Sequence, residues 1–186
     1  MRTLSRFKLQ QIIQHIRTGG LLAYPTEAVY GLGCDPDNHT AVASLLALKS
    51  RSPSKGLILI ASDIQQLAPY IKPQNTDITA KLKATWPGPV TWLLPAKKTT
   101  PKWLTGNHST IACRVTNHPL VQQLCSTYAG ALVSTSANRA NQSPCRSAIQ
   151  VRKQFHSNDL RIISGATGGL IQPTQIFDAA TSARLR

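Results

Sequence analysis

Short apolar runs alternate with longer helical patterns along the whole chain, and this alternation is the strongest constraint on its fold. A series of this kind favours a sheet with helices packed on it. We therefore expect an α/β protein whose twisted, open sheet is mostly parallel or mixed. Apolar runs that follow one another around 90–115, read as three strands in a row or nearly so, predict that part of the sheet is antiparallel. The expected strands are 21–24, 56–61, 90–96, 110–115, 131–137, 161–165 and 174–178.

The length of 186 residues suits one domain with a sizeable core and is short for two. No repeat or linker interrupts the pattern, so residues 1–186 are expected to form a single domain. The first segment predicts an amphipathic helix that ends at Gly19 and Gly20. The apolar positions of this helix are Leu4, Phe7, Ile12, Ile13 and Ile16.

The sequence shows no pattern of export or metal binding. No apolar run reaches the length of a membrane span, and the N-terminal segment lacks the apolar centre of a secretory signal. The four cysteines are scattered, without the close pairs of a zinc site. We therefore expect a cytoplasmic protein that has buried free thiols and neither membrane contact nor a metal site.

Charge is the outlier of the composition, because 21 Lys and Arg oppose 7 Asp and Glu, for a net charge of +14. No carboxylate occurs between Asp77 and Asp159, whereas ten basic residues do. Such a field attracts polyanions, either nucleotide phosphates or nucleic acid, and predicts a basic concave cleft.

Several common catalytic motifs are absent, including the P-loop, G-x-G-x-x-G, H-E-x-x-H and G-x-S-x-G. The five histidines are dispersed, and each is expected to be a surface or capping residue. His118, directly before Pro119, fits a helix start best.

Polar residues instead follow the expected strands. Thr26 and Glu27 come directly after the strand that Pro25 ends, where open α/β sheets place ligands, although an ordinary strand-to-loop transition is the alternative. Ser134 and Ser136 lie on the same side of a later strand, and such a pair can hold an oxyanion.

Basic residues gather in two places. The segment KSRSPSK holds Lys49, Arg51 and Lys55 without a carboxylate, which indicates either a phosphate site or a solvated basic turn. Arg114 lies in an apolar strand and requires a partner. A substrate carboxylate suits its planar guanidinium better than a structural salt bridge, because the chain has few acids.

The ordered motifs of the chain resemble those of the YrdC/Sua5 family of threonylcarbamoyl-AMP synthases in its short bacterial form. These motifs are YPTEAVYGLGCDP, KSR with KGLILI, WPGPVTWLLPA, RVTNHPLV, LVSTSAN, TGG and PTQIFDA. The resemblance covers almost the whole chain and implies the YrdC-like fold. It also implies an enzyme, a nucleotidyltransferase that converts L-threonine, bicarbonate and ATP to threonylcarbamoyl-adenylate and pyrophosphate. A partner transferase complex would use this product to form N6-threonylcarbamoyladenosine at position 37 of tRNAs that read ANN codons.

The resemblance also implies residue roles. Lys49 and Arg51 match the K-x-R motif and would bind the triphosphate as the catalytic residues. The residues implied for substrate binding are Thr26, Tyr30, Arg114 and Thr174 around the threonine, with Lys55 near both the threonine and the phosphate sites. The residues implied for bicarbonate and ATP phosphates are Ser134, Ser136 and Asn138. Mg²⁺ is expected to arrive with ATP, held mainly by phosphates and water, and Glu27, Asp35 and Asp37 are expected to be surface carboxylates.

Three positions depart from the family pattern. Ser52 stands where proline often follows K-x-R, and Ala140-Asn141 replaces a Ser-Gly pair. Leu170 replaces a basic residue after the late glycines, which removes one expected phosphate contact.

A different class of function is a non-catalytic RNA-binding protein that acts in tRNA or ribosome maturation. The charge favours this class equally. However, the ten aromatic residues are not interleaved with basic ones as a base-stacking surface requires.

Overall fold

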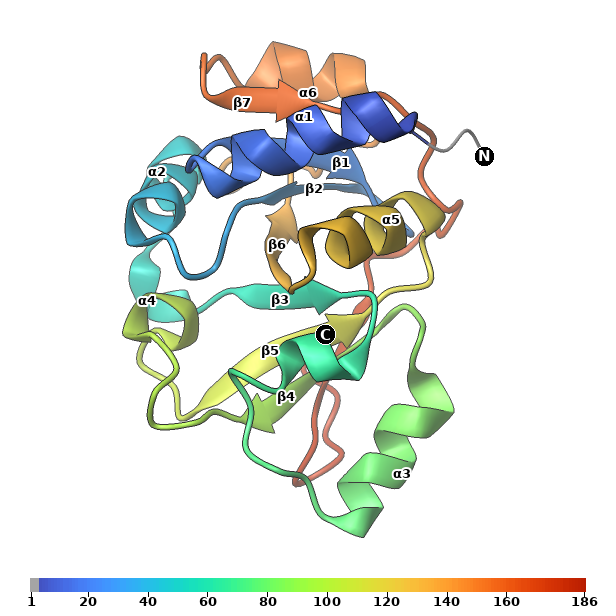
Figure 1. The fold of residues 1–186 in the computed structure, drawn as a ribbon. Coiled ribbons are helices and arrows are strands. Elements are labelled where there is room, and N and C mark those ends of the chain that lie inside the picture. The colour runs from blue at the N-terminus through green and yellow to red at the C-terminus, as the bar shows by residue number, and fades with distance from the viewer. Residues whose placement is uncertain (1–3) are drawn as a thin grey trace.

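The structure is a computed structural model that describes residues 4–186, and it forms one α/β domain (Figure 1). Its larger helices are α1 (Arg6–Arg17), α2 (His39–Lys49), α3 (Thr76–Thr85), α5 (Pro119–Tyr128) and α6 (Ala148–Gln154). Its short helices are η1 (Pro53–Lys55), η2 (Ile64–Leu67) and α4 (Lys102–Thr105). Its strands are β1 (Leu21–Pro25), β2 (Tyr30–Gly33), β3 (Ile58–Ala61), β4 (Val90–Pro95), β5 (Thr110–Val115), β6 (Leu132–Ser136), β7 (Leu160–Ile162) and β8 (Gln175–Asp178).

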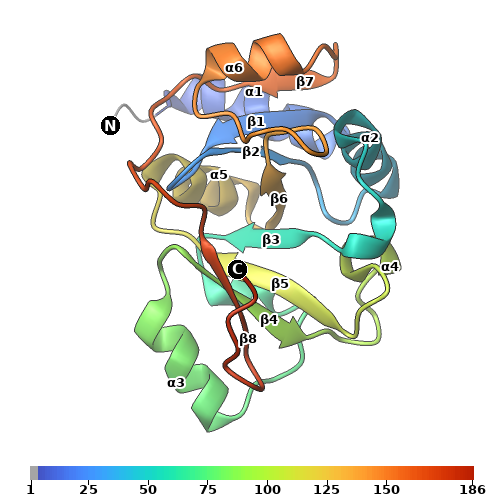
Figure 2. The ribbon, with the colours of Figure 1, turned by 180° about the vertical axis from the view of Figure 1, so that it is seen from behind.

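The eight strands form one mixed sheet in the order β7-β1-β2-β6-β3-β5-β4-β8. The β1–β7, β3–β5 and β4–β8 pairs are parallel, and the other four pairs are antiparallel. The expected mixed sheet is therefore confirmed, but parallel pairs are not its majority. The antiparallel β4–β5 pair is the one that adjacent apolar runs predicted. Figure 2 shows the C-terminal segment leading into β8, which lies beside β4 as the edge strand of the sheet.

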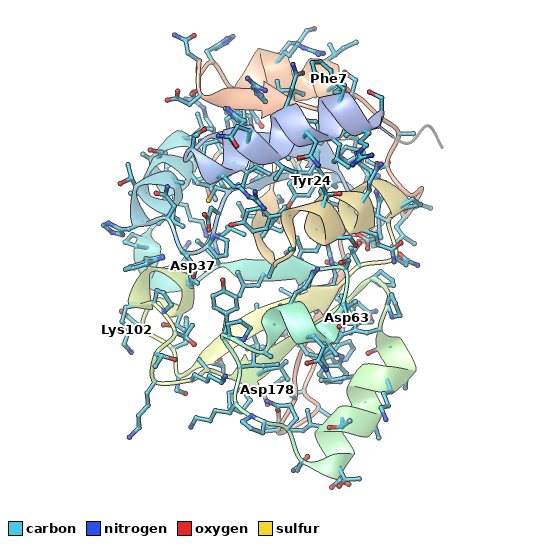
Figure 3. The ribbon with its side chains drawn as sticks, in the orientation of Figure 1. Phe7, Tyr24, Asp37, Asp63, Lys102 and Asp178 are labelled. Atoms are coloured by element: carbon cyan, nitrogen blue, oxygen red, sulfur yellow. The ribbon has the colours of Figure 1, made fainter. Side chains whose placement is uncertain are left out.

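Helices α1 and α5 pack against each other and against β1, and their apolar residues form a cluster with Tyr24. Figure 3 shows Tyr24 next to these helices and Phe7 on the outer side of α1. The α1 helix buries Leu9, Ile12, Ile13 and Ile16, whereas Phe7 is 75% exposed. Its expected place on the apolar face was wrong, because Leu9 occupies the core position in that turn.

The larger core cluster joins the sheet to α2, α4 and α6. All five residues of β1 are buried, as expected for a strand with a continuous apolar run. The four cysteines are buried and free. None of the helices within residues 4–186 combines the length and apolar character needed to cross a membrane.

Candidate active site

A pocket of about 340 Å³ opens where β2, β3, β5 and β6 meet the C-terminal segment. Its volume is within the range of small-molecule sites. Along β5 the side chains alternate, so that Ala112 and Arg114 line the pocket while Ile111 and Cys113 lie in the core. Eight of the ten residues expected in the site line this pocket: Thr26, Tyr30, Arg51, Lys55, Arg114, Ser134, Ser136 and Thr174.

The lining residues fall into two sets, which we call the amino acid end and the cationic end of the pocket; the first set is Thr26, Tyr30, Arg114 and Thr174. The Thr26 hydroxyl donates to the Val29 carbonyl at 2.8 Å, which fixes the turn between β1 and β2. The Tyr30 hydroxyl donates to the Gly165 carbonyl at 2.7 Å and accepts from the Gly165 amide at 3.0 Å. Arg114 Nη1 donates to Thr174 Oγ1 at 2.8 Å. A guanidinium among hydroxyl groups can receive a carboxylate in a bidentate contact.

One expectation at this end was wrong. Glu27 is not a surface carboxylate, because it is 4% exposed, and its Oε2 lies 3.3 Å from Arg114 Nη2. The structural salt bridge judged weaker for Arg114 therefore exists. His118 occupies the N-cap position of α5, as expected for a residue at a helix start, although its side chain makes no capping hydrogen bond. It is buried, and burial lowers its pKa.

The other end of the pocket is cationic. Arg51 follows the end of α2, where Ser50 adopts the left-handed conformation with φ of 52° and turns the chain. Arg51 Nη2 donates to the Gly56 carbonyl at 3.0 Å, and burial lowers the pKa of this guanidinium. Lys55 is exposed at the end of η1. No carboxylate is found among the pocket-lining residues of the described chain, so an anion can satisfy these charges.

Lys49 and Asn138 do not line the pocket but support the residues that do. Lys49 Nζ donates to the Ser136 carbonyl and, at 2.6 Å, to the Asn138 carbonyl. The Ser136 hydroxyl donates to Asn138 Oδ1 at 2.6 Å. The Lys49 side chain thus stands behind the S-x-S-A-N turn. Burial, together with the charge of Arg51, lowers its pKa to about 8.

This lowered pKa predicts a specific pH dependence of stability. The unfolded chain holds the Lys49 proton up to its ordinary pKa of 10.5, whereas the folded protein releases it near pH 8. The contribution of Lys49 to the free energy of unfolding therefore rises with pH in this window. The free energy of unfolding of the wild type, minus that of Lys49→Met, is expected to increase by about 2 kcal/mol from pH 7 to pH 10. Urea titrations across this range measure it, and parallel pH profiles of the two proteins would contradict it.

Arg186 is a pocket residue that sequence reasoning missed. The chain after β8 turns back, and Arg186 Nε and Nη2 donate to the Thr174 carbonyl at 3.3 and 3.0 Å. Although the residue as a whole is exposed, its guanidinium is partly enclosed. This enclosure, and the nearby Arg114 and Arg51, lower its pKa. The turn after β8 brings Arg186 to the pocket, and no sequence motif predicts this turn.

The sequence of this chain is similar to those of known proteins. A model of the Sua5/YciO/YrdC family, described as "Telomere recombination", matches residues 14–185. A threonylcarbamoyl-AMP synthase of Yersinia pestis (strain Pestoides F) is 50% identical over 184 residues, which cover 98% of this chain and 96% of that relative.

Solved structures share the fold. P. abyssi Sua5 complexed with L-threonine superposes with a TM-score of 0.91 at 28% identity over 99% of this chain. The present chain covers 54% of that Sua5 chain, about half its length. E. coli YciO gives a TM-score of 0.77 at 25% identity, with coverage of 94% of this chain and 84% of YciO.

Proposed function

We propose, because this chain belongs to the Sua5/YciO/YrdC family, that it is a threonylcarbamoyl-AMP synthase. The observation that carries the proposal is one pocket whose lining residues form two sets of different chemistry. One end presents a guanidinium among hydroxyl groups, which suits an amino acid carboxylate. The other presents cations without a carboxylate, which suits a polyphosphate.

The proposed reaction combines L-threonine, bicarbonate and ATP. The threonine amine attacks the carbon of bicarbonate, so that a C–N bond forms while a C–O bond breaks, and the released hydroxide takes an amine proton and leaves as water, which gives a carbamate. The carbamate then attacks the α-phosphorus of ATP, which makes the enzyme a nucleotidyltransferase that releases pyrophosphate. No protein nucleophile is required, so the contribution of the chain is to position anionic reactants and to offset their charges.

The roles follow from the two ends. Arg114 pairs with the threonine carboxylate, and Thr26, Tyr30 and Thr174 form the walls around it. Arg51 and Lys55 meet the triphosphate. Ser134 and Ser136 provide hydroxyl groups for bicarbonate and phosphate at the end of β6.

Lys49 and Asn138 act from behind the S-x-S-A-N turn. Lys49 holds the carbonyls of Ser136 and Asn138 and adds positive charge under the turn. Because hydroxyl and carbonyl oxygens surround this end without a carboxylate, Mg²⁺ would be held mainly by the phosphates and water. Within residues 4–186, no group of three or more His, Cys, Asp or Glu side chains is placed to hold a metal ion.

The cellular role proposed is in the cytoplasm. The adenylate passes to a threonylcarbamoyl transferase complex that modifies position 37 of tRNAs reading ANN codons. The net charge of +14 also suits contact with the RNA itself.

Pyrophosphate release by the purified protein tests the proposal. Release is expected only with ATP, bicarbonate and L-threonine together. L-serine, which lacks the methyl group, should support a rate lower by roughly tenfold or more. Absence of release under every combination would contradict the synthase and favour the RNA-binding function, whose affinity should fall steeply with salt.

Arg186 is expected to contribute to ATP binding, because its guanidinium lines the pocket together with Arg51 and Arg114 and no carboxylate side chain of the described residues faces it there. Arg186→Ala should raise the KM for ATP by roughly tenfold, which corresponds to one charge-assisted hydrogen bond. Initial rates at varied ATP measure the effect. An unchanged KM for ATP would show that the side chain serves only to hold the C-terminal segment.

A further inference from the structure

Glu27 is the one acidic residue that is buried among the described residues 4–186, and its contact with Arg114 is the one ion pair found there. The other oxygen of the carboxylate, Oε1, accepts from the Thr116 hydroxyl at 2.6 Å. A buried pair of charges loses its hydration and is a weak device for stability alone. The position of the pair next to the pocket therefore requires another explanation.

The Arg114 guanidinium contacts two different partners within the protein. Nη2 lies against Glu27, and Nη1 donates to Thr174 Oγ1. Arg114 and Thr174 line the pocket, whereas Glu27 does not. Glu27 thus touches the guanidinium without entering the space that a ligand would occupy.

Within the described part of the protein, Arg114 Nε has no hydrogen-bond partner, and Glu27 Oε2 has the ion-pair contact with Arg114 alone. Buried polar groups of this kind require an explanation, and a ligand in the neighbouring pocket offers one.

The main chain around Glu27 ties the same pair to the C-terminal segment. The Leu170 amide donates to the Glu27 carbonyl at 3.0 Å, and the Gly168 amide donates to the Thr26 carbonyl at 2.9 Å. A Cβ at Gly168 would lie 3.0 Å from Glu27 Cα, so the close approach favours glycine there. The segment that carries Thr174 is therefore fixed against Glu27 as well.

We propose that Glu27 is a positioning residue for the amino acid end of the pocket. It holds Arg114 in the orientation that receives the substrate carboxylate. Its negative charge also offsets that of Arg114, so this end accepts a single carboxylate and does not compete with the cationic end for polyphosphate. This inference rests on the proposed function, because it takes the ligand to be L-threonine.

The experiment compares Glu27→Gln with Asp159→Asn, which removes the same charge from an exposed side chain. Calorimetry measures the binding of L-threonine and of ATP separately, and pyrophosphate release gives the two KM values. For Glu27→Gln the Kd and KM for L-threonine are expected to rise roughly 10- to 100-fold, while those for ATP do not rise. Pyrophosphate should become a competitor of L-threonine in this variant. Asp159→Asn should behave as wild type.

Further variants separate positioning from a merely structural role. Glu27→Asp should restore part of the affinity for L-threonine. The melting temperature of each variant is recorded with the kinetics, so that a loss of folding is recognised. If Glu27→Gln does not fold, Thr116→Val removes the hydrogen bond to Oε1 and should raise the KM for L-threonine alone, roughly threefold. Equal losses for threonine and ATP, or no loss for threonine, would overturn the proposal.

The proposed function can fail separately. A wild-type protein that binds L-threonine but releases no pyrophosphate would overturn the synthase reaction, and calorimetry would still decide the role of Glu27. A wild-type protein that binds no L-threonine would overturn both.

Discussion

Replacing Arg51 with alanine is expected to lower kcat/KM for pyrophosphate release roughly 100- to 1000-fold while the fold is kept. The Arg51 guanidinium lines the cationic end of the pocket, has one hydrogen bond, to the Gly56 carbonyl, and has a buried Nε without a partner. No carboxylate of the described residues forms an ion pair with it. Its charge is therefore available to the triphosphate, whose negative charge must be offset as the pyrophosphate leaves.

Arg6→Ala provides the matched control, because Arg6 is an exposed arginine of α1 far from the pocket residues. Arg51→Lys should recover only part of the activity, since an ammonium cannot reproduce the planar, two-pronged contact of a guanidinium. Initial rates and circular dichroism measure activity and folding. Activity of Arg51→Ala within threefold of the control would remove Arg51 from the catalytic residues.

Gly33→Ala is expected to destabilise the protein by about 2–3 kcal/mol, because the core there has no space for a methyl group. A Cβ at Gly33 would collide with the Val133 carbonyl of β6 and would lie 2.9 Å from the Tyr24 hydroxyl. The β6 backbone at Val133 cannot move aside, because β6 is also paired with β3. The Tyr24 side chain is fully buried.

Gly31→Ala on the same strand is the control. Its Cβ would meet only side-chain atoms, Ser134 Oγ, Thr26 Cγ2 and Tyr24 Cε2, each at 3.3 Å. These can yield by a few tenths of an ångström, so a loss below about 1 kcal/mol is expected. Chemical denaturation gives both free energies of unfolding. Equal losses at the two positions would show that close approach of the β6 backbone is not the reason for Gly33.

Strand ends are the part of the site that the sequence predicts well. Apolar runs located β1, β5 and β6 to within a residue or two, and polar side chains at their ends meet in one pocket. Arg114 lies on the face of β5 that lines the pocket, whereas Ile111 and Cys113 face the core. Local sequence patterns suffice for this prediction, because the side chains at a strand end follow from the sequence itself, whichever strands lie beside it.

Partners distant in sequence were the part that could not be predicted. Glu27 looked like a loop carboxylate, and only the arrangement of β1, β2 and β5 brings Arg114 and Thr116 to it. The direction of the Lys49 side chain depends on the turn after β6, which its own helix does not encode. Phe7 and Leu9 are both apolar, and packing against α5 decides which of them is buried.

The strand order also determines when the pocket can exist during folding. Leu21 of β1 pairs with Leu160 of β7, and β4 pairs with β8. Neither edge of the sheet can therefore form until residues late in the chain are in place. Such long loops must close before their contacts are gained, which places the protein among slow-folding topologies. The pocket draws on β2, β6, β5 and the segment before β8. A partly folded intermediate that lacks the β8 edge therefore lacks a complete pocket.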